Sequence, residues 1–473
     1  MGVVTDRSAT RANYAAPAAR IRAGTQPAPV PPTGAPATGR TRTAATLLLL
    51  TAVLPVNAAI TGMAALIGLT RRARRPRSTA TRQTIMLSGG KMTKALTLAR
   101  AFHDAGHRVV LVEQARYRLS GHRFSRAVDA FHVVPAPDAP DYAERLAEIA
   151  QHEGVDVYVP VCSPLASWYD ADAKQALEPL CEVVHPDSDV VALLDDKHRF
   201  AQAAAAMGLP VPDTHRITDP QQVIDFDFTS APGSTYVLKS IAYDPVRRMD
   251  LTRLPHPTAH QTADFVRRLP ISSDNPWILQ EFVEGTEYCT HSTVRDGAVA
   301  LHCCCPSSAF QLNYTAVTHP VIDEWVRRFC TELGVTGQLS FDFIERADGS
   351  VYAIECNPRT HSAITLFHDH PGLADAYLSA HAGPPAVPDP GARPTYWLYH
   401  ELGRLLGAPT SLPKRLRTIL RGKEALLEAR DPLPFLLVPH LQIAALLLDK
   451  LVRGTPWVKI DINIGKLVES AGD

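Results

Sequence analysis

The feature that most constrains the fold is an acidic strand–turn–strand segment, "GQLSFDFIERADGSVYAIECNPR", at residues 337–359. Two apolar stretches flank "RADGS", which is typical of a hairpin turn of the Asp-Gly type. In such a hairpin Asp342 and Glu355 lie close together on neighbouring strands. Asn357 shares the face of Glu355 because residues two apart on a strand point the same way. The segment therefore predicts an antiparallel hairpin that gathers oxygen-bearing side chains on one face.

These side chains are candidate metal ligands. Two carboxylates on one face repel each other and are costly to desolvate unless a cation lies between them. Mg²⁺ prefers oxygen ligands and shares them with substrate phosphates. We therefore expect Asp342, Glu355 and Asn357 to form an open divalent-metal site, with Arg359 just beyond it. Taken alone, the segment is explained equally well as a strand that ends at a Pro turn.

Length, charge and cysteine content narrow the class of protein. The chain has 473 residues, which is enough for two or more domains. The 48 Lys and Arg residues equal the 48 Asp and Glu residues, which argues against a general nucleic-acid binder. Three of the 8 Cys residues are consecutive, at 303–305, and no CxxC pair occurs. Free thiols in a reducing compartment are the simplest interpretation.

The N-terminal part has no acidic residue between Arg7 and His103. Residues 1–42 are rich in Ala, Pro and Arg and are predicted to be a disordered tail. Residues 43–70 carry no charge and are long enough to cross a bilayer core of about 30 Å. Pro55 and Asn57 near the middle of this segment permit a kink or a re-entrant hairpin.

A basic linker, residues 71–83, follows and begins "RRARRPR". Its charge places the rest of the chain on the cytoplasmic side by the positive-inside rule. We therefore expect a cytoplasmic catalytic domain that is anchored to the cytoplasmic face of a membrane through residues 43–70. A transit peptide is the alternative, because such peptides are also Arg-rich and poor in acid. A cleaved secretory signal fits less well.

The remaining chain divides into three parts. Strands alternate with helices over residues 84–185, which predicts an α/β domain with a parallel sheet. "SGGKMTK" (88–94) and "CSP" (162–164) follow strands, where ligands bind in such sheets. "SGGK" lacks the P-loop spacing and is equally well a plain strand–helix turn. Residues 186–385 mix strands and helices and predict an α+β domain. Residues 386–473 form a C-terminal extension whose run "PLPFLLVPHLQIAALLLDKLV" indicates a core or interfacial helix.

Several polar residues upstream of the hairpin suit a nucleotide. Lys239 lies in the apolar strand "YVLKS", where an ammonium group is costly unless it meets an anion. Lys197 is the second candidate, although a solvated surface lysine explains it as well. "WILQEFVEG" is a strand that enters a linker, whose backbone could pair with a planar base. Glu281 could then accept from an exocyclic amine and Glu287 from ribose hydroxyls, or both are ordinary surface glutamates.

The order of these elements is more specific than any one of them. Together they supply cations for phosphates, a base pocket, a ribose acceptor, a metal clamp and an arginine for the transferred phosphoryl group. Phosphoryl transfer depends on this kind of positioning and charge neutralisation. Over residues 84–378 the sequence resembles the ATP-grasp superfamily. The resemblance implies a pre-ATP-grasp α/β domain followed by an α+β ATP-grasp domain, preceded by the hydrophobic segment.

A closer resemblance is to the mycosporine-glycine synthase family of mycosporine-like amino acid biosynthesis. It is carried by "SGGKMTKAL", "GHRFS", "VYVPVCSP", "DDK", "LKSIAYDPVRR", "QEFVEGTEYCTHSTVRDG", "HCCCPSSAFQ", "AIECNPRTHSAIT" and "WVKIDINIGKLVE". It implies a ligase that joins glycine to 4-deoxygadusol and cleaves ATP to ADP and phosphate. The enol oxygen would be phosphorylated, the glycine amine would add, and phosphate would leave to give an ultraviolet-absorbing product.

The resemblance also implies roles for individual residues. Arg359 and Lys239 match catalytic residues, and Asp342, Glu355 and Asn357 match the ligands of one or two Mg²⁺ ions, with Mn²⁺ as a substitute. The residues that match ATP contacts are Lys197, Lys239, Glu281, Phe282, Val283 and Glu287. The loop after Lys239 lacks the glycines of many grasp loops. Arg247 and Arg248 are therefore either phosphate ligands or a surface basic pair.

The acceptor substrates would contact three short motifs, "SGGKMTK", "GHRFS" and "NPRTHS". Their candidate residues are Ser88, Lys91, His122, Arg123, His361 and Ser362. The two histidines are equally well structural. Two other functions remain open: an amino-acid or peptide ligase that activates a true carboxylate, and a membrane-anchored nucleotide-binding regulator without catalysis. The intact lysines and metal ligands argue against the regulator.

Overall fold

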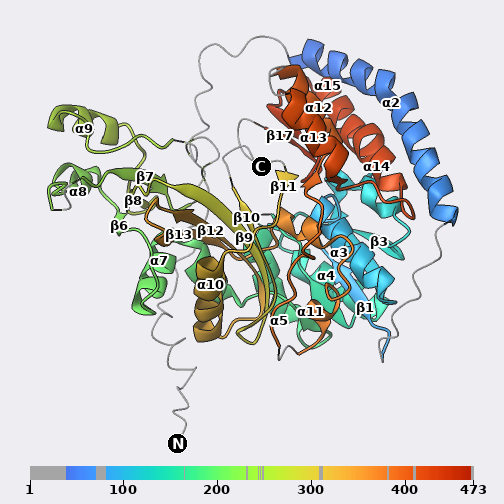
Figure 1. Cartoon of the computed structure of the whole chain (residues 1–473), viewed down its shortest axis with the longest axis horizontal. Helices are drawn as coiled ribbons and strands as arrows, with labels where there is room; N and C mark the ends of the chain where they lie inside the picture. The colour runs from blue at the N-terminus through green and yellow to red at the C-terminus, as the bar shows by residue number, and fades with distance from the viewer. Residues whose placement is uncertain are drawn as a thin grey trace, which may run out of the picture.

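The computed structural model describes residues 39–70, 81–163, 166–230, 233–242, 244, 247, 250–307, 313–380, 383–407 and 412–469. Figure 1 shows a parallel sheet with its helices on one side of the molecule and antiparallel sheets on the other. Helices of the C-terminal extension pack beside the parallel sheet, and one long N-terminal helix lies along their outer side.

The first domain is a five-stranded sheet of order β3-β2-β1-β4-β5, and every pairing is parallel. Its strands are apolar along their length, as expected for a sheet that helices cover on both faces. The strands are β1 (Thr84–Leu87), β2 (Arg108–Gln114), β3 (Ala130–Val134), β4 (Val157–Val159) and β5 (Glu182–Val183). The helices are α3 (Thr93–Asp104), α4 (Tyr142–Glu153) and α5 (Ala166–Leu177), with short 3-10 turns η1 (Ala115–Tyr117) and η2 (Gly121–Phe124).

Two antiparallel sheets follow. The smaller has the order β6-β8-β7 and the larger β10-β9-β12-β13. The strands are β6 (Thr214–Ile217), β7 (Tyr236–Ser240), β8 (Trp277–Glu281), β9 (Thr286–Arg295), β10 (Ala298–Pro306), β12 (Gly337–Glu345) and β13 (Val351–Asn357). The helices are α6 (Ser188–Asp195), α7 (Lys197–Ala206), α8 (Pro220–Ile224), α9 (Ala259–Val266) and α10 (Pro320–Leu333). The predicted acidic hairpin is β12–β13.

An aromatic core fixes the larger sheet. Trp325 of α10 packs on Phe341 and Phe343 of β12, with ring centroids 5.5 and 5.3 Å apart. Phe200 of α7 packs on Trp325 and Phe341, with ring centroids 6.2 Å apart in both pairs. Because Phe341 and Phe343 point away from Asp342 along the strand, burying these rings turns the Asp342 carboxyl to the opposite face. The core therefore decides which face of the hairpin carries the acids.

The C-terminal extension, together with three short elements that precede it (β11, η3 and α11), forms small sheets and a helical layer. Strands β11 (Asn313–Tyr314), β14 (Thr395–Tyr396) and β15 (Lys423–Glu424) form one sheet, and β16 (Lys459–Asp461) pairs with β17 (Lys466–Val468). The helices are α11 (Asp375–Leu378), α12 (Leu398–Gly407), α13 (Leu412–Arg421), α14 (Leu433–Leu437) and α15 (Ala444–Arg453), and Ser362–Phe367 is a 3-10 turn, η3. A π-helical turn over Val438–Ile443 joins α14 to α15, so the predicted apolar helix is interrupted near Pro439.

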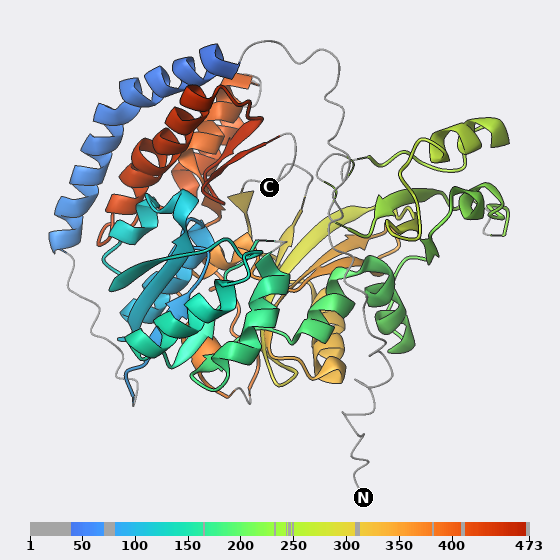
Figure 2. The ribbon, with the colours of Figure 1, turned by 180° about the vertical axis from the view of Figure 1, so that it is seen from behind.

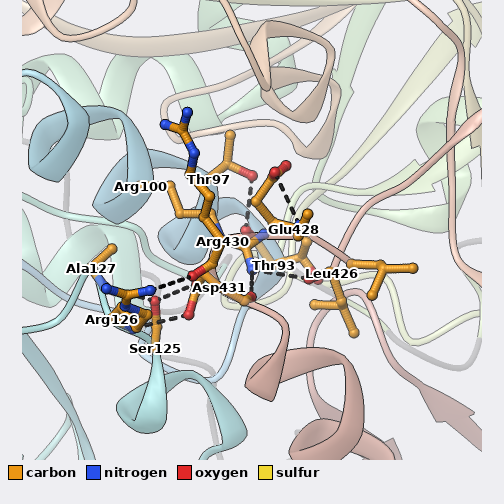
Figure 3. Close-up of polar contacts among 12 residues, drawn as sticks. Thr93, Thr97, Arg100, Ser125, Arg126, Ala127, Leu426, Glu428, Arg430 and Asp431 are labelled. Carbon is orange, nitrogen blue, oxygen red and sulfur yellow. Dashed lines mark hydrogen bonds and ion pairs between the residues drawn. The ribbon is translucent and has the colours of Figure 1, made fainter. Parts of the chain in front are cut away.

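Asp431 attaches this extension to the first domain, as Figure 3 shows. Its carboxylate accepts hydrogen bonds from Arg100 Nε (2.8 Å), Ser125 Oγ (2.6 Å) and the Arg126 backbone N–H (2.9 Å). Arg100 also donates to the carbonyl oxygen of Leu426 at 2.9 Å. Asp431 is buried, so these contacts compensate a carboxylate that is removed from water. The extension is therefore an integral part of the folded body.

The charge-free N-terminal segment forms one continuous helix, α2 (Gly39–Thr70), with Pro55 inside it. The helix is continuous, so the re-entrant hairpin that Pro55 and Asn57 would permit is not formed. In both Figure 1 and Figure 2, α2 lies along the outer side of the C-terminal helices, and it packs on α14 and α15. Among the described residues, two helical segments are long and apolar enough to cross a membrane by length and composition alone: Gly39–Thr70 and Leu433–Arg453.

Candidate functional site

The acidic pair has the geometry that the sequence predicts. Asp342 of β12 lies directly opposite Glu355 of β13, beside an irregularity in the register that follows Asp342. Burial and repulsion from Glu355 raise the pKa of Asp342 well above its usual range. Burial would also raise the pKa of Glu355, but Lys197, a hydrogen bond with Asp342 and the cations Lys239 and Arg359 together outweigh burial and hold that pKa at about 2. Both carboxylates are half-buried, so the pair is a partly desolvated concentration of negative charge that nearby cations partly neutralise.

Two lysines from different elements reach this pair. Lys197 is the first residue of α7, where the Asp196 side chain caps the helix by accepting from the backbone N–H groups of His198 and Arg199. Its Nζ lies 3.4 Å from Glu355 Oε2. Burial alone would lower the pKa of Lys197, but the attraction and hydrogen bond of Glu355, together with the attraction of Asp195, outweigh burial and raise it. Lys197 is thus an ion-paired lysine and not a solvated surface residue.

Lys239 lies in β7 of the smaller sheet, and its Nζ donates to Gln280 Oε1 at 3.0 Å. Burial lowers the pKa of Lys239, although the attraction of Glu355 opposes this change. The smaller sheet therefore contributes a cation on the side where the larger sheet contributes carboxylates. A polyanion between the two sheets would relieve the cost of burying both lysines.

Asn357 and Arg359 extend the site beyond the end of β13. Asn357 Nδ2 lies 3.4 Å from Glu355 Oε1, and a guanidinium nitrogen of Arg359 donates to Asn357 Oδ1. Arg359 also contributes to the depressed pKa of Glu355. The structure thus brings together five of the predicted residues: Lys197, Lys239, Asp342, Glu355 and Arg359, with Asn357 between the last two.

These donors fit a divalent cation that also binds phosphate. Within the described ranges, no group of three or more His, Cys, Asp or Glu side chains could hold a metal ion. The protein would therefore supply two carboxylates and the Asn357 amide oxygen, and other ligands would complete the shell. That ligand set is typical of Mg²⁺ sites, which usually keep water and substrate oxygens. Arg359 would have to release Asn357 Oδ1 for the amide to bind the metal.

The segment predicted to bind a base begins at the end of β8. Backbone N–H groups of Glu281 and Phe282 donate to the carbonyl oxygens of Asp213 and Thr235, and Val283 is buried. The Glu281 carboxylate is engaged by Arg346 at 2.7 Å. The prediction that this carboxylate takes an exocyclic amine would require it to leave Arg346. Glu287, at the start of β9, is exposed and free to meet a ribose.

The basic pair after β7 is only partly described. Arg247 donates to both oxygens of the buried Asp244, from its backbone N–H at 3.0 Å and from its guanidinium at 3.1 Å. Arg247 is thus committed to the loop, and a phosphate would have to compete with Asp244. Arg248 lies among the residues that the structure leaves undescribed.

The candidate acceptor residues of the first domain gather at the carboxyl edge of the parallel sheet. A pocket there is lined by Ser88, Lys91, Glu113, Cys162 and Asp170, among others. Lys91 Nζ lies 3.4 Å from Glu113 Oε1 and 4.3 Å from the centroid of the Tyr117 ring. Ser88 Oγ accepts from the Val161 backbone N–H at 2.9 Å.

The "GHRFS" residues do not join this pocket. His122 is fully buried, its Nδ1 lies 3.1 Å from the Gly90 carbonyl oxygen, and burial lowers its pKa to about 3. Arg123 donates to the carbonyl oxygen of Arg118 and covers the Phe131 ring at 4.7 Å. A structural role, which the sequence left open for His122, is the one that these contacts support.

The "NPRTHS" loop contacts residues that the motifs did not single out. His361 Nδ1 accepts from the Ala363 backbone N–H at 3.2 Å, and the His361 N–H donates to His291 Nδ1 at 3.3 Å. The Nε2 atom of each neutral imidazole therefore carries the proton and is a donor. Burial lowers the pKa of His291 well below its usual range and that of His361 to about 3. Ser362 Oγ accepts from Asn463 Nδ2 at 2.8 Å.

Lys94 is a site residue that sequence reasoning missed, although it lies in the quoted "SGGKMTK". Its Nζ donates to the carbonyl oxygens of Thr360 (2.6 Å) and Cys162 (3.2 Å), so it joins the first domain to the residue after Arg359. Burial lowers the pKa of Lys94 to about 7, and the nearby cations Arg359 and Lys91 act in the same direction. An ammonium group can donate three hydrogen bonds, so one remains for a ligand.

Comparisons with known proteins support the fold. No family model matches the chain. The carbamoyl phosphate synthase large chain of Vibrio cholerae serotype O1 (strain ATCC 39315 / El Tor Inaba N16961) is 26% identical over 220 residues, which are 42% of this chain and 19% of that protein. The same protein of Vibrio vulnificus (strain CMCP6) is 24% identical over 220 residues. The match thus spans about a fifth of these relatives.

Among solved structures, the ADP complex of N5-carboxyaminoimidazole ribonucleotide synthetase superposes with a TM-score of 0.52 at 16% sequence identity. The superposition covers 70% of this chain and 86% of that one. On this similarity the chain has the fold of the ATP-grasp superfamily.

Proposed function

We propose that the chain is an ATP-dependent ligase that forms a C–N bond and releases ADP and phosphate. The observation that carries this proposal is the half-buried Asp342–Glu355 pair, with Lys197, Lys239 and Arg359 around it. Mg²⁺ supplies charge neutralisation for the phosphates when it is bound. The chain's own cations would then hold the phosphates and stabilise the charge that develops on the transferred group.

The individual ATP contacts are proposed from the same cluster of residues and from the resemblance to the ATP-grasp superfamily. Lys197 and Lys239 would bind the α- and β-phosphates, and Arg359 would contact the γ-phosphoryl group. The linker over residues 281–283 would bind adenine through its backbone, and Glu287 would accept from the ribose hydroxyls. The metal ligands would be Asp342, Glu355 and Asn357, for one or two Mg²⁺ ions, with Mn²⁺ as a substitute.

For the acceptor we propose 4-deoxygadusol, with glycine as the amine, which gives mycosporine-glycine. The enol oxygen would attack the γ-phosphorus and displace ADP; the glycine amine would then add to the ring, and phosphate would leave with its bonding electrons. The resemblance of the quoted motifs supports this substrate. The geometry supports an anionic, enolised oxygen as the acceptor. The "NPRTHS" loop carries Arg359 and the neutral donor His361, and Lys94 and the neutral donor His291 contact this loop.

The alternative is an amino-acid or peptide ligase that activates a carboxylate as an acyl phosphate. The same cations would suit a carboxylate, which is why the metal and ATP residues cannot separate the two reactions. Positional isotope exchange does separate them. ATP labelled with ¹⁸O at the β–γ bridge should scramble its label when 4-deoxygadusol is added without glycine. Scrambling that requires a carboxylic acid instead would establish the alternative.

We further propose that the catalytic body lies in the cytoplasm and associates with a membrane through residues 43–70. The exposed apolar surface of α2 supports this proposal.

A further inference from the structure

Helix α2 is attached to the rest of the protein along one narrow stripe. Its buried residues Thr43, Leu50, Asn57 and Ala64 recur every seven positions, with Thr61 beside them. A repeat of seven keeps one face of a helix against a partner over its whole length. The partners are α14 and α15 of the C-terminal extension. Three of these five buried residues are polar, which is unusual for the inner face of a helix on a soluble protein.

The polar residues explain how the helix is held. Near the N-terminus of α2, Trp457 Nε1 donates to Thr43 Oγ1 at 2.9 Å. In the middle, Asn57 Nδ2 donates to Tyr399 Oη at 2.7 Å and to the Phe435 carbonyl oxygen at 3.3 Å. Near the C-terminus, a Cβ on Gly68 would lie 2.1 Å from the Ala429 carbonyl oxygen, so only glycine permits this approach.

Attachment at both ends and in the middle is incompatible with a helix that leaves the body to cross a bilayer. The partner segment cannot span either, because the π-helical turn after α14 packs on the first domain. There, a Cβ on Gly121 would lie 2.5 Å from the Val438 backbone nitrogen, and Gln442 accepts from the Gly121 N–H at 2.8 Å. Both apolar helices therefore belong to the folded body.

The outer face of α2 is nevertheless apolar. Leu69 is 79% exposed and Leu48 is 71% exposed, at opposite ends of the helix. Large apolar side chains between them are exposed as well: Leu49, Leu54, Val56, Met63, Leu66 and Ile67. The helix thus buries polar residues and exposes leucines, which is the reverse of a helix that faces water. A contiguous patch of this kind marks an interaction surface.

Two helices of the extension also expose apolar side chains: α15, which packs on α2, and α13, which packs on α12. Leu448 and Val452 lie one turn apart on α15, the partner of α2, and Val452 is 78% exposed. On α13, Leu412, Leu416 and Leu420 form an exposed stripe at spacing four, with exposed Arg417 and Arg421 beside it. An apolar stripe flanked by arginines is typical of a helix that lies in the plane of a membrane surface.

We propose that α2, α13 and α15 form a monotopic face that binds one leaflet of an anionic bilayer, with α2 lying in the membrane plane. Charge selects a bilayer over a second copy of the chain. Neither α2 nor α13 contains an acidic residue that could meet the exposed arginines of a copy, and Asp449 of α15 is paired with Arg453 of the same helix at 2.7 Å. The sequence "RRARRPR" directly follows α2, and anionic headgroups attract such a cluster.

The first test is co-sedimentation of the full chain with vesicles. Phosphatidylcholine mixed with phosphatidylglycerol should bind the protein, and phosphatidylcholine alone should bind it more weakly. The double variant Leu48→Glu, Leu66→Glu should reduce binding by about tenfold or more, because it places charge on the lipid face. The matched control Leu180→Glu, an exposed leucine of the first domain, should not. Both variants should retain Mg²⁺·ADP binding, since the changed side chains are exposed.

The second test separates an in-plane helix from a spanning one. The 8 native cysteines are buried, so Arg40→Cys and Thr70→Cys provide unique labelling sites at the two ends of α2. An impermeant maleimide added outside sealed vesicles should label both positions to the same extent. Protection of one end would overturn the in-plane arrangement. Self-association without lipid that Leu48→Glu abolishes would overturn the bilayer in favour of a second copy.

Discussion

At the scale of single residues, the acceptor side of the site depends on Lys94. Its ammonium is buried between two carbonyl oxygens, beside Arg359, and has a donor to spare. Lys94→Met should therefore raise KM for the acceptor about ten- to hundredfold, the range expected for a lost charged hydrogen bond, and change KM for ATP little. Steady-state kinetics in both substrates check this. Lys174→Met is the control, because Lys174 pairs with Asp187 and the His185 carbonyl oxygen away from the site. An equal rise for ATP and acceptor would contradict the assignment.

The pKa of Lys94 also gives a pH dependence. Burial lowers that pKa to about 7, so the ammonium is present below pH 7 and is lost as the pH rises through it. The groups that face Lys94 are the cations Arg359 and Lys91, the neutral histidines His291 and His361, and the Cys162 thiol. Binding of an anionic acceptor should weaken above about pH 7 in the wild type. In Lys94→Arg the same binding, measured by titration, should stay level, since arginine keeps its charge.

At the scale of elements, the hairpin and α2 differ in how far the sequence reveals them. Local signals define β12–β13: an Asp-Gly turn, alternating apolar residues and acids that face each other. Nothing local shows that Asn57 meets Tyr399 and Phe435, which lie more than three hundred positions away. For the same reason Lys94 was overlooked, because its partner Thr360 is distant in sequence. Contacts between remote segments need the tertiary structure.

Asn57 tests the docking of α2. Asn57→Ala removes three hydrogen bonds, to Tyr399, to the Phe435 carbonyl oxygen and from Thr61, and leaves that carbonyl oxygen buried with a partner lost. The free energy of unfolding should fall by about 1–3 kcal/mol, the cost of such a loss. Chemical denaturation monitored by circular dichroism measures it. Thr51→Ala on the exposed side of α2, whose hydroxyl bonds only the Leu47 carbonyl oxygen, is the control and should have little effect. Equal stability of the two variants would argue that α2 is not docked.

At the scale of the whole molecule, the extension over residues 386–473 ties the first domain to α2. The Asp431 cluster is the main polar contact on the first-domain side. Asp431→Ala should lower the free energy of unfolding by about 3 kcal/mol, because Arg100 would lose its buried partner. Asp449→Ala removes an exposed pair with Arg453 and should change it by less than about 1 kcal/mol. Chemical denaturation of the two variants, compared with the wild type, measures both changes in the free energy of unfolding.

Because of the same connections, the proposed activity should be measured with a protein that includes α2 and the extension. A protein that begins at Thr84 would lack α2 and expose the surface of α14 and α15 that α2 covers. The fold and the metal hairpin follow from sequence patterns and family resemblance. The identity of the acceptor does not, because the residues that would touch it come from three separate regions.

The most direct test of the central claim is a single assay of the full chain with ATP, Mg²⁺, 4-deoxygadusol and glycine. ADP release should require both organic substrates and should parallel the appearance of a red-shifted ultraviolet chromophore. Glu355→Gln should lose activity by at least about a hundredfold while remaining folded, and Glu345→Gln, on the same hairpin, should retain it. ADP release that does not depend on 4-deoxygadusol, or full activity of Glu355→Gln, would contradict the account.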